Sequence, residues 1–537
     1  MIKRTVQAIF FIITVFLLSC GTPETKSEER PNILFIMSDD HAYQAISAYS
    51  DHLIETPNID RLAKEGMLFT NASVTNSICA PSRATILTGK HTHINGKIDN
   101  ITPFDTTQVT FPQLFQDAGY QTAMFGKLHF GNNPKGVDDF MILPGQGSYI
   151  NPRFITATGD TTITGYVTDI ITDLTLDWLD KKRNPEKPFL MMYLHKAPHR
   201  SWWPSPEKFR EFLAKTYPEP ETLFDDYENR GSAAKEAAMT ISDEMILSYD
   251  NKVLPDAVDQ VGSVDDPRNR PYFENNEYPR INAAQSVEYY PLLDSIAEDF
   301  KRNWPTMTSR ERISWKYQRY MQDYLGCISS VDDNIGRVLD YLDEHGLSEN
   351  TLVVYTSDQG FYLGEHGWFD KRFIYKESFK TPLLIRWPNE IKPGITNNEL
   401  VQNLDFAQTF LEAAQIDASE DMQGQSFMPL LKGDAESWDR NSVYYHYYEY
   451  PGAHMVKRHY GIVTKAYKLA HFYYDVDEWE LYDLTADPNE MNNVYDDPDY
   501  TAIVEELKGE LTNLRKKYKD ASELDQKYIE LYENRKK

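Results

Sequence analysis

Three short runs of hydrophobic residues divide the chain, and each is followed at once by polar residues. The runs 32–38, 189–194 and 351–357 are almost continuously apolar, as is typical of strands buried on both faces of a parallel sheet. They are followed by Asp39-Asp40-His41, by His195-Lys196-Ala197-Pro198-His199 and by Asp358-Gln359-Gly360. Ligands of open α/β sheets bind at the carboxyl ends of the strands. We therefore expect these polar residues to form one shared site.

Helical spacing of apolar residues alternates with these runs. It predicts helices over 58–65, after Pro81, over 166–181 and from about 317 to 345, where Thr308 and Glu311 upstream offer a capping box. This alternation predicts an α/β fold with a large, mostly parallel sheet. From residue 442 the runs become aromatic and β-rich, and an amphipathic pattern follows over 500–518. Residues 438–537 are therefore predicted to form a small C-terminal α+β subdomain with an antiparallel sheet.

Residues 201–305 follow neither pattern. They are rich in Pro, Asn, Tyr and acidic residues, and we expect an irregular insert. An insert of this length beside a site acts as a lid or substrate-binding surface, or it is decoration, and the sequence leaves both open. Trp202 and Trp203 at its start either stack on a sugar ring or pack in the core.

Composition narrows the possible functions. The 537 residues are 41% hydrophobic, which is enough to bury a large core. The net charge of -27 argues against binding of nucleic acid, because that binding relies on Lys and Arg to neutralise phosphates. An anionic substrate would need a local basic pocket within an acidic shell.

The N-terminus carries an export signal. Lys3 and Arg4 precede a short apolar run that ends in Leu17-Leu18-Ser19-Cys20, which resembles a bacterial lipobox. We expect residues 1–19 to be a lipoprotein signal peptide, Cys20 to be the lipidated first residue, and residues 20–30 to be a flexible tether. The protein would then be a cell-envelope lipoprotein of the outer membrane, compatible with display on the cell surface. An ordinary signal peptide and a short uncleaved anchor are the alternatives.

Carboxylates at the predicted strand ends suggest a metal site. Asp39, Asp40 and Asp358, with the amide of Gln359, offer hard oxygen ligands, which favour Ca²⁺, with Mg²⁺ as the alternative. Carboxylates placed together raise one another's pKa unless a cation neutralises them. Asp39-Asp40 alone would also fit a polar strand end. The second strand followed by Asp, at Asp358, favours the metal.

Two cysteines lie beyond Cys20. Cys327 falls beside the apolar stripe of the long predicted helix and fits a small packed side chain. Cys79 has no such explanation, and Pro81 would place it at the positive end of a helix. A thiol nucleophile would need a Cys–His signature, which is absent, and a structural cysteine would not explain Arg83.

The stretch Cys79-Ala-Pro-Ser-Arg-Ala-Thr-Ile-Leu-Thr-Gly89 matches in full the signature C-x-P-S-R-x-x-x-L-T-G of type I sulfatases. Further blocks that resemble this family follow in the family's order, at 35–40, 56–62, 119–129, 197–199, 357–360, 364–367 and 479–490. The resemblance extends from about residue 31 to the C-terminus. It implies the alkaline-phosphatase-like α/β sandwich, with residues 31–437 as the catalytic domain.

The resemblance also implies a chemistry. A maturation enzyme would oxidise Cys79 to formylglycine (3-oxoalanine), whose hydrated aldehyde attacks the ester sulfur. The ligands of Ca²⁺ would be Asp39, Asp40, Asp358, Gln359 and the modified Cys79. Gln359 departs from the commoner Asn or His of the family but keeps an amide oxygen for the metal.

The remaining roles follow from the same resemblance. Arg83 and Lys127 would hold the formylglycine, and His129 would accept the proton that drives sulfate elimination. His199 and Lys371 would grip the sulfate, and His199 would protonate the leaving oxygen. Arg372 could share the role of Lys371. Three histidines stay unassigned: His91, His195 and His366.

The first functional hypothesis is a sulfatase of the EC 3.1.6 type that acts on a sulfated polysaccharide or oligosaccharide. Algal glycans such as ulvan or carrageenan, glycosaminoglycans and mucin are all open. One alternative is a phosphomonoester or phosphonate ester hydrolase, because related enzymes share the formylglycine signature. Another is a non-catalytic glycan-binding protein, if Cys79 stays unmodified.

Overall fold

The computed structural model of the chain describes residues 30–262 and 266–535. The predicted signal peptide, Cys20 and all but the last residue of the predicted tether lie outside these residues. Within them, no helix has the length and apolar character needed to cross a membrane.

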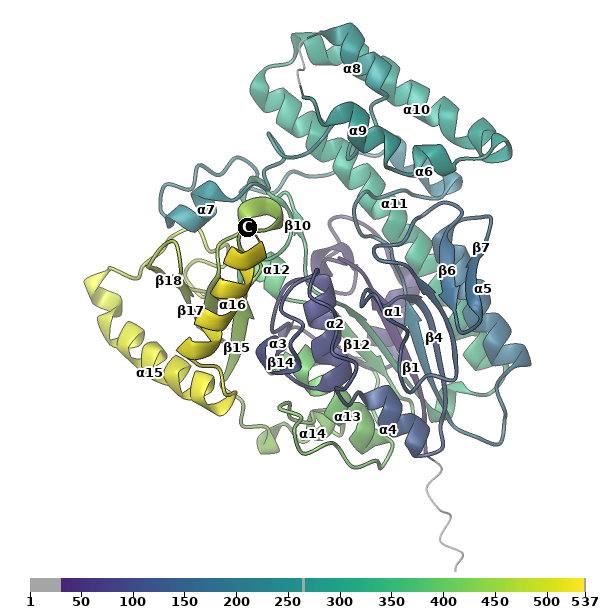
Figure 1. Cartoon of the computed structure of the whole chain (residues 1–537), viewed down its shortest axis with the longest axis vertical. Coiled ribbons are helices and arrows are strands. Elements are labelled where there is room, and N and C mark those ends of the chain that lie inside the picture. Colours follow the sequence, from purple (N-terminus) through teal and green to yellow (C-terminus); the bar gives the residue numbers. More distant parts are fainter. Residues whose placement is uncertain (1–29, 263–265, 536–537) are drawn as a thin grey trace, which may run out of the picture.

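A ten-stranded sheet forms the centre of the molecule (Figure 1). Its strands, in spatial order, are β13 (Ile395–Asn397), β2 (Met67–Phe69), β12 (Leu383–Arg386), β9 (Thr351–Ser357), β1 (Asn32–Ser38), β8 (Phe189–Leu194), β4 (Gln121–Lys127), β5 (Asp139–Leu143), β6 (Arg153–Thr156) and β7 (Gly159–Thr162). The five strands from β9 to β5 are parallel to one another. Antiparallel strands extend the sheet on both sides.

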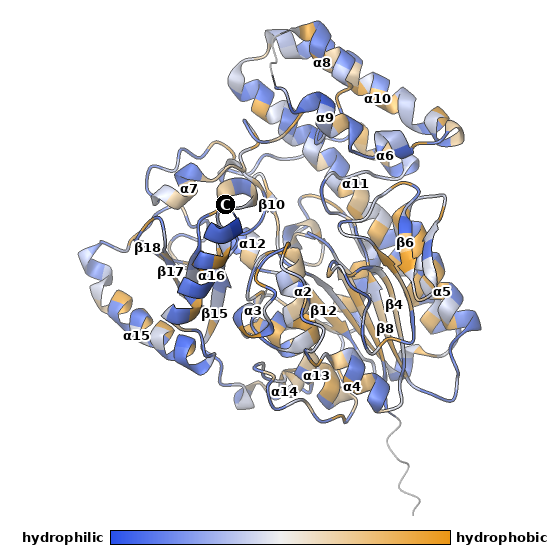
Figure 2. Cartoon of the chain, viewed as in Figure 1, coloured by the Kyte–Doolittle hydropathy of each residue, from blue (hydrophilic) through white to orange (hydrophobic). Residues whose placement is uncertain are grey.

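Helices cover both faces of the sheet, because alternate residues of each strand point to opposite sides. Leu34 and Ile36 of β1 join one hydrophobic core, and Ile33 and Phe35 join the other. The first core is covered by α1 (Pro57–Lys64), α5 (Val167–Lys181) and α11 (Ser309–Glu344); the second by α2 (Cys79–Thr88), α4 (Phe111–Asp117), α13 (Phe406–Ala413) and α14 (Met428–Leu431). Figure 2 shows the apolar strands between these amphipathic helices. The predicted α/β sandwich is confirmed.

A second, four-stranded antiparallel sheet follows towards the C-terminus. Its strands are β15 (Ser442–Tyr447), β16 (His459–Thr464), β17 (Tyr467–Phe472) and β18 (Glu478–Asp483). Leu507 and Leu511 of α15 (Thr501–Lys517) pack against Tyr444 and Leu469 of this sheet, and α16 (Ser522–Arg535) follows. The predicted small α+β unit is present. The boundary after residue 437 lies between α14 and β15 and stays a prediction.

The expectation of an irregular insert over 201–305 is wrong, because this segment contains several helices (Figure 1). They are α6 (Pro206–Leu213), α7 (Ser232–Glu236), α8 (Pro255–Val261), α9 (Asn269–Glu274) and α10 (Ala283–Asn303). In α10, Asn282 and Gln285 form a capping box, and apolar residues such as Leu293 and Phe300 are buried at helical spacing. Acidic residues and Pro291 inside the helix obscured this spacing in the sequence. Trp202 and Trp203 are fully buried, which decides for core packing.

Candidate active site

The polar residues after the central strands meet at one edge of the sheet because the strands end at the same level. Ser38 of β1 pairs with Ser357 of β9, and Met37 pairs with Leu194 of β8. The next strand, β4, reaches this level at Gly126, directly before Lys127. A Cβ atom on Gly126 would lie 1.8 Å from the carbonyl oxygen of Leu194, and its φ of +111° also favours glycine. Only glycine therefore fits immediately before Lys127.

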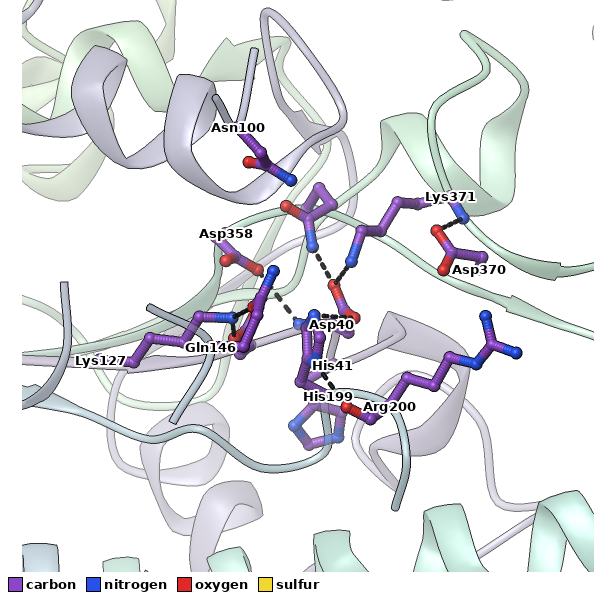
Figure 3. A network of polar contacts seen from close by, with 12 residues as sticks. Asp40, His41, Asn100, Lys127, Gln146, His199, Arg200, Asp358, Asp370 and Lys371 are labelled. Atoms are coloured by element: carbon purple, nitrogen blue, oxygen red, sulfur yellow. Dashed lines mark hydrogen bonds and ion pairs between the residues drawn. The ribbon is translucent and has the colours of Figure 1, made fainter. Parts of the chain in front are cut away.

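Three buried aspartates converge at this edge. Asp39, Asp40 and Asp358 each place a carboxylate oxygen within 4.8 Å of the others, and Figure 3 shows Asp40 and Asp358. The backbone N–H of Asp40 donates to Oδ1 of Asp358 at 3.1 Å. Oδ2 of Asp40 and Oε1 of Gln359 are buried and accept no hydrogen bond from the described residues. Buried oxygens without donors in a set of three carboxylates fit a divalent cation with oxygen ligands.

Basic side chains surround the carboxylates. Arg83 donates from Nε to Oδ2 of Asp358 at 2.9 Å, and its Nη2 lies 3.7 Å from Oδ1 of Asp39. Lys127 pairs with Asp39 and also donates to the side chain of Gln146. Lys371 pairs with Oδ1 of Asp40 at 2.5 Å (Figure 3). These cations supply the local positive charge that the acidic chain needs in order to bind an anion.

Cys79 is the first residue of α2, and it is fully buried. Its Sγ and ligand atoms of Asp39 and His199 lie within 4.8 Å of one another. The helix is fixed at the site because Ser82 donates to the backbone carbonyl of Asp358, and Asn100 accepts from the N–H of Ala80 at 3.1 Å. If residue 79 were a formylglycine, the position of Sγ would be taken by its aldehyde or hydrate oxygens. These oxygens would then lie at the positive end of α2, next to the carboxylates.

Two predicted histidines border the same space. Nε2 of His199 lies 3.8 Å from Oδ2 of Asp40, and its Nδ1 is hydrogen-bonded to the carbonyl of Arg200 at 2.6 Å. Because a carbonyl only accepts, Nδ1 carries the proton and Nε2 is free to exchange one with a ligand. His129 is partly buried, and its Nδ1 is buried without a hydrogen-bond partner among the described residues. Each imidazole therefore has a nitrogen left for a proton transfer.

Burial and charge shift the ionisation of these groups. Burial opposes the charge of Asp39, but Lys127 and the neighbouring cations hold its pKa well below the ordinary value. Burial raises the pKa of Asp40 to about 7 and that of Asp358 to about 6, and neighbouring carboxylates add to both shifts. Burial and Lys127 hold the pKa values of His129 and His199 well below the ordinary value. Without a bound anion, both histidines are neutral at pH 7.

Several non-glycine residues at the site have positive φ angles. The φ angles of Asp40 and His129 are +66° and +69°, and those of Asp370 and Arg372, on either side of Lys371, are +78° and +97°. Positive φ costs free energy in residues other than glycine, and it persists where the surrounding structure enforces it. The strained backbone lies in the turn that carries Asp40 on one side of the site and in the turn that carries Lys371 on the other.

Comparison with known families decides what this site belongs to. The model of the sulfatase family matches residues 31–416, and the model of the C-terminal region of N-sulphoglucosamine sulphohydrolase matches residues 364–517. The chain belongs to the sulfatase family. Members of this family hydrolyse sulfate esters with a metal ion and a formylglycine.

Two curated relatives of this sulfatase are named for the carbohydrates on which they act. It is 46% identical over 510 residues to an N-acetylglucosamine-6-O-sulfatase of Bacteroides thetaiotaomicron, which covers 94% of this chain and 89% of the relative. An ulvan-active sulfatase of Formosa agariphila is 24% identical and covers 94% of the chain and 86% of its own length. This similarity extends through the catalytic sheet and the C-terminal sheet alike.

A solved structure gives the same picture. This structure shows a protein in complex with its substrate, D-glucosamine-2-N,6-O-disulfate, and that protein is 46% identical in sequence to this chain. The two structures align with a TM-score of 0.86 over 92% of this chain and 99% of the other. A phosphonate monoester hydrolase of Silicibacter pomeroyi aligns with a TM-score of 0.61 at 20% identity, over 91% of this chain and 96% of that one. The latter shares the fold alone.

The structure also places the residues that the sequence left unassigned or missed. His195 is buried behind the strand ends, and burial lowers its pKa to about 3. The ring of His91 packs at a tilt against that of Tyr518, and His366 is hydrogen-bonded to Arg230, so both histidines make structural contacts. Gln146 and Asn100, which touch Lys127 and the start of α2, were missed because they lie in loops without a recognisable pattern.

A polar cavity of about 440 Å³ opens beside His199. Its walls include Gln146, Lys196, His199, Arg200, Glu277 and Arg280. The volume falls in the range of about 300–1,000 Å³ that is usual for small-molecule sites. Residues 274–280 belong to the insert, so the insert forms part of the wall of this cavity.

Proposed function

We propose that this sulfatase removes the 6-O-sulfate from a glucosamine residue of a sulfated glycan. The observation that carries the proposal is the 46% identity over 94% of the chain to a sulfatase named for N-acetylglucosamine 6-O-sulfate. The polar cavity beside His199 supports it, because a saccharide needs many hydrogen bonds and few apolar contacts. Ulvan and carrageenan become second candidates, since the ulvan-active relative is 24% identical.

The basic residues of the site bind the ester in this proposal. The ammonium of Lys371, paired with Asp40, is placed to bind the sulfate oxygens and to offset charge that develops on them. Lys127, paired with Asp39, is placed to hold the formylglycine. His199 presents Nε2 towards the same space. The negative charge of a bound sulfate raises the pKa of His199, which lets Nε2 carry the proton that the leaving sugar oxygen receives.

The groups that act on the sulfur side are held by α2 and β4. Arg83, at 2% exposure, fixes Asp358 and so keeps α2 next to the carboxylates. In the modified protein, the hydrate of formylglycine 79 supplies the nucleophile. His129 has a free ring nitrogen near Lys127 and Asp39, and it takes up the proton released when sulfate leaves.

Asp39, Asp40, Asp358 and the amide oxygen of Gln359 are proposed to hold Ca²⁺. All four groups offer oxygen, as Ca²⁺ prefers, and no imidazole is included in the set. A cation held there would offset the charge of the three carboxylates and would supply Lewis acidity to the site. Mg²⁺ is the alternative, and it requires a more regular octahedron of ligands.

The N-terminal pattern completes the proposal. Lipidation at Cys20 would anchor the enzyme to the outer membrane, where an acidic, soluble catalytic domain meets extracellular glycans. Replacement of Cys20 by Ala should move the enzyme from the membrane fraction to the soluble fraction. Retention in the membrane would contradict lipidation at this position.

The test compares three sugar esters that differ in the acid group or in the sugar and the position of the ester. We expect release of sulfate from N-acetylglucosamine 6-sulfate with a kcat/KM at least about 100-fold above that for N-acetylglucosamine 6-phosphate and for N-acetylgalactosamine 4-sulfate. A preference for phosphate would favour the phosphohydrolase alternative. Mass spectrometry of the peptide that carries residue 79 completes the test: an unmodified thiol in fully active protein would contradict the formylglycine mechanism.

A further inference from the structure

One cation in the wall of the cavity makes no direct ion pair with any described residue, although Glu277 and Asp39 are near enough to favour its charge. Lys196 follows β8 and His195, and it is 3% exposed. Among the described residues, its ammonium makes neither a hydrogen bond nor an ion pair, and it lies 4.5 Å from the centroid of the Tyr149 ring. A buried lysine without a carboxylate partner is unusual, because burial of an unpaired charge costs free energy.

Two other charged groups of the cavity, Arg200 and Glu277, already have partners. Arg200 donates from Nε and Nη2 to Asp250, at 2.7 Å each. The carboxylate of Glu277 accepts the backbone N–H groups of Tyr149 at 2.8 Å and Ile150 at 3.1 Å. Glu277 therefore closes the insert onto the loop at residue 149 instead of pairing directly with Lys196. The side chain of Arg280 is 44% exposed at the rim.

Lys196 is also close to the proposed leaving-group acid. The backbone N–H of His199 donates to the carbonyl of Lys196 at 3.0 Å, so the two residues lie on one turn, and both line the cavity. Burial, with Lys127 nearby, lowers the pKa of Lys196 to about 8. The ammonium is thus still largely protonated at pH 7, and an anion in the cavity would lower the cost of its charge.

We propose that Lys196 binds a second anionic group of the substrate, distinct from the sulfate that is hydrolysed. This inference rests on the proposed function and names its substrate class more closely: a glucosamine 6-sulfate that carries another sulfate or a carboxylate within reach of the cavity. The substrate of the solved relative, D-glucosamine-2-N,6-O-disulfate, has this character. The second anion is either an N-sulfate on the same ring or a uronate on the neighbouring one.

The experiment measures kcat/KM for three 6-sulfated substrates: N-acetylglucosamine, N-sulfoglucosamine, and a disaccharide in which a uronate is linked to N-acetylglucosamine. The variants are Lys196→Met, which keeps the length but removes the charge, and Lys196→Arg, which keeps a charge. Lys187→Met is the matched control, because Lys187 is an exposed lysine before β8, outside the cavity lining.

We expect Lys196→Met to lose about tenfold or more of the preference for one of the doubly charged substrates over the N-acetyl substrate, as for loss of a charged hydrogen bond. The substrate whose preference falls identifies the anion. Lys196→Arg should regain part of the preference, and Lys187→Met should leave it unchanged. An equal loss on all three substrates, or none, would overturn the assignment.

Measurements of ligand binding test the role of Lys196 independently of the proposed function. The same ligands are titrated by calorimetry against Cys79→Ala and against the double variant Cys79→Ala/Lys196→Met, neither of which needs turnover. A tenfold weaker affinity for the doubly charged ligand alone supports Lys196 even if turnover requires another sulfate position. An unchanged affinity ratio overturns the role of Lys196, whereas absence of 6-sulfate hydrolysis by the wild type would overturn only the proposed function.

Discussion

Two places in the described chain gather metal-binding side chains in similar geometry, and they differ in how many of their buried oxygens lack a hydrogen-bond donor. At the active site, oxygens of Asp39, Asp40 and Asp358 lie within 4.8 Å of one another. In the C-terminal subdomain, ligand atoms of His446, Asp520 and Asp525 meet the same limit. Both sets are buried, so distance and burial alone do not distinguish them.

Hydrogen bonds and ion pairs hold the C-terminal cluster together. Asp520 accepts from the hydroxyl of Tyr444 and from Nδ1 of His446, the latter at 2.7 Å. Arg515 donates to Asp525 at 2.7 Å and lies 3.8 Å from Asp520. These contacts tie the segment between α15 and α16 to β15. In this cluster the guanidinium of Arg515 supplies the positive charge that a bound metal ion would otherwise supply.

At the active site, Arg83, Lys127 and Lys371 likewise pair with the aspartates. More buried oxygens are left without a hydrogen-bond donor among the described residues there, however: both of Asp39, Oδ2 of Asp40 and Oε1 of Gln359, against Oδ1 of Asp520 and Oδ1 of Asp525. Oδ2 of Asp40 has only His199, at 3.8 Å, and Oε1 of Gln359 accepts no hydrogen bond from the described residues. A buried acceptor without a donor costs free energy unless a ligand satisfies it. The larger number of buried oxygens without a donor, rather than the number of carboxylates, therefore marks the active site as the one that fits a metal.

The largest difference is expected between the two buried cysteines. Cys79→Ala should lower kcat by at least about a thousandfold, because the nucleophile is removed while the fold is kept. Cys327→Ala serves as the control: it leaves a small cavity in the core and lowers the melting temperature, but keeps most of the activity. Sulfate release and thermal unfolding are measured on both. Activity retained in Cys79→Ala would contradict the mechanism.

Removal of metal should separate the two acidic clusters. A chelator should abolish activity and remove the stabilisation by bound metal, about 3 kcal/mol when the metal is present at 100 times its Kd. Asp358→Asn should have the lower stability of the metal-free wild type from the start, and a chelator should not change it. Asp525→Asn should keep the full response, since its cluster is closed by Arg515. Loss of the chelator effect in Asp525→Asn instead would place the metal in the C-terminal subdomain.

The C-terminal cluster should matter for stability alone. Asp520→Asn leaves His446 and Arg515 without their buried carboxylate, and we expect the free energy of unfolding to fall by about 3 kcal/mol. The kcat should stay within about twofold of the wild type, because no residue of the cluster lines the cavity beside His199. Denaturant unfolding and sulfate release measured together test this. A large fall in kcat at equal foldedness would argue against a purely structural cluster.

The smallest expected effect is a pH dependence of stability. Burial opposes the charge of Asp520, but His446 and Arg515 hold its pKa well below the ordinary value. A pKa depressed in the folded state contributes stability that is present above the unfolded pKa of about 3.9 and is lost as pH falls below it. Unfolding free energies measured from pH 6 down to acid should therefore decrease less steeply in Asp520→Asn than in the wild type. Parallel curves would contradict the shift.

Local patterns in the sequence predicted the framework well. The continuous apolar runs became β1, β8 and β9, and α1, α5 and the end of α11 lie within one residue of the predicted helices. These elements depend on nearest-neighbour chemistry, namely burial on both strand faces and 3.6-residue spacing. The helices of the insert were missed because charged residues and Pro291 weaken the same spacing in α10. What helps to fix α10 is its packing against Trp315 of α11, a contact between residues of separate elements that a local sequence pattern does not report.

The sequence by itself determined which residues belong to the site: the signature at Cys79 and the strand-end aspartates are contiguous motifs that retain their meaning without coordinates. Tertiary structure alone decided how they are used. The register that pairs Ser38 with Ser357 aligns the aspartates, and the closing of the insert by Glu277 makes a cavity with Lys196 in its wall. These features bring together residues far apart in the chain. Whether a charge is compensated there depends on the burial and partners that folding creates.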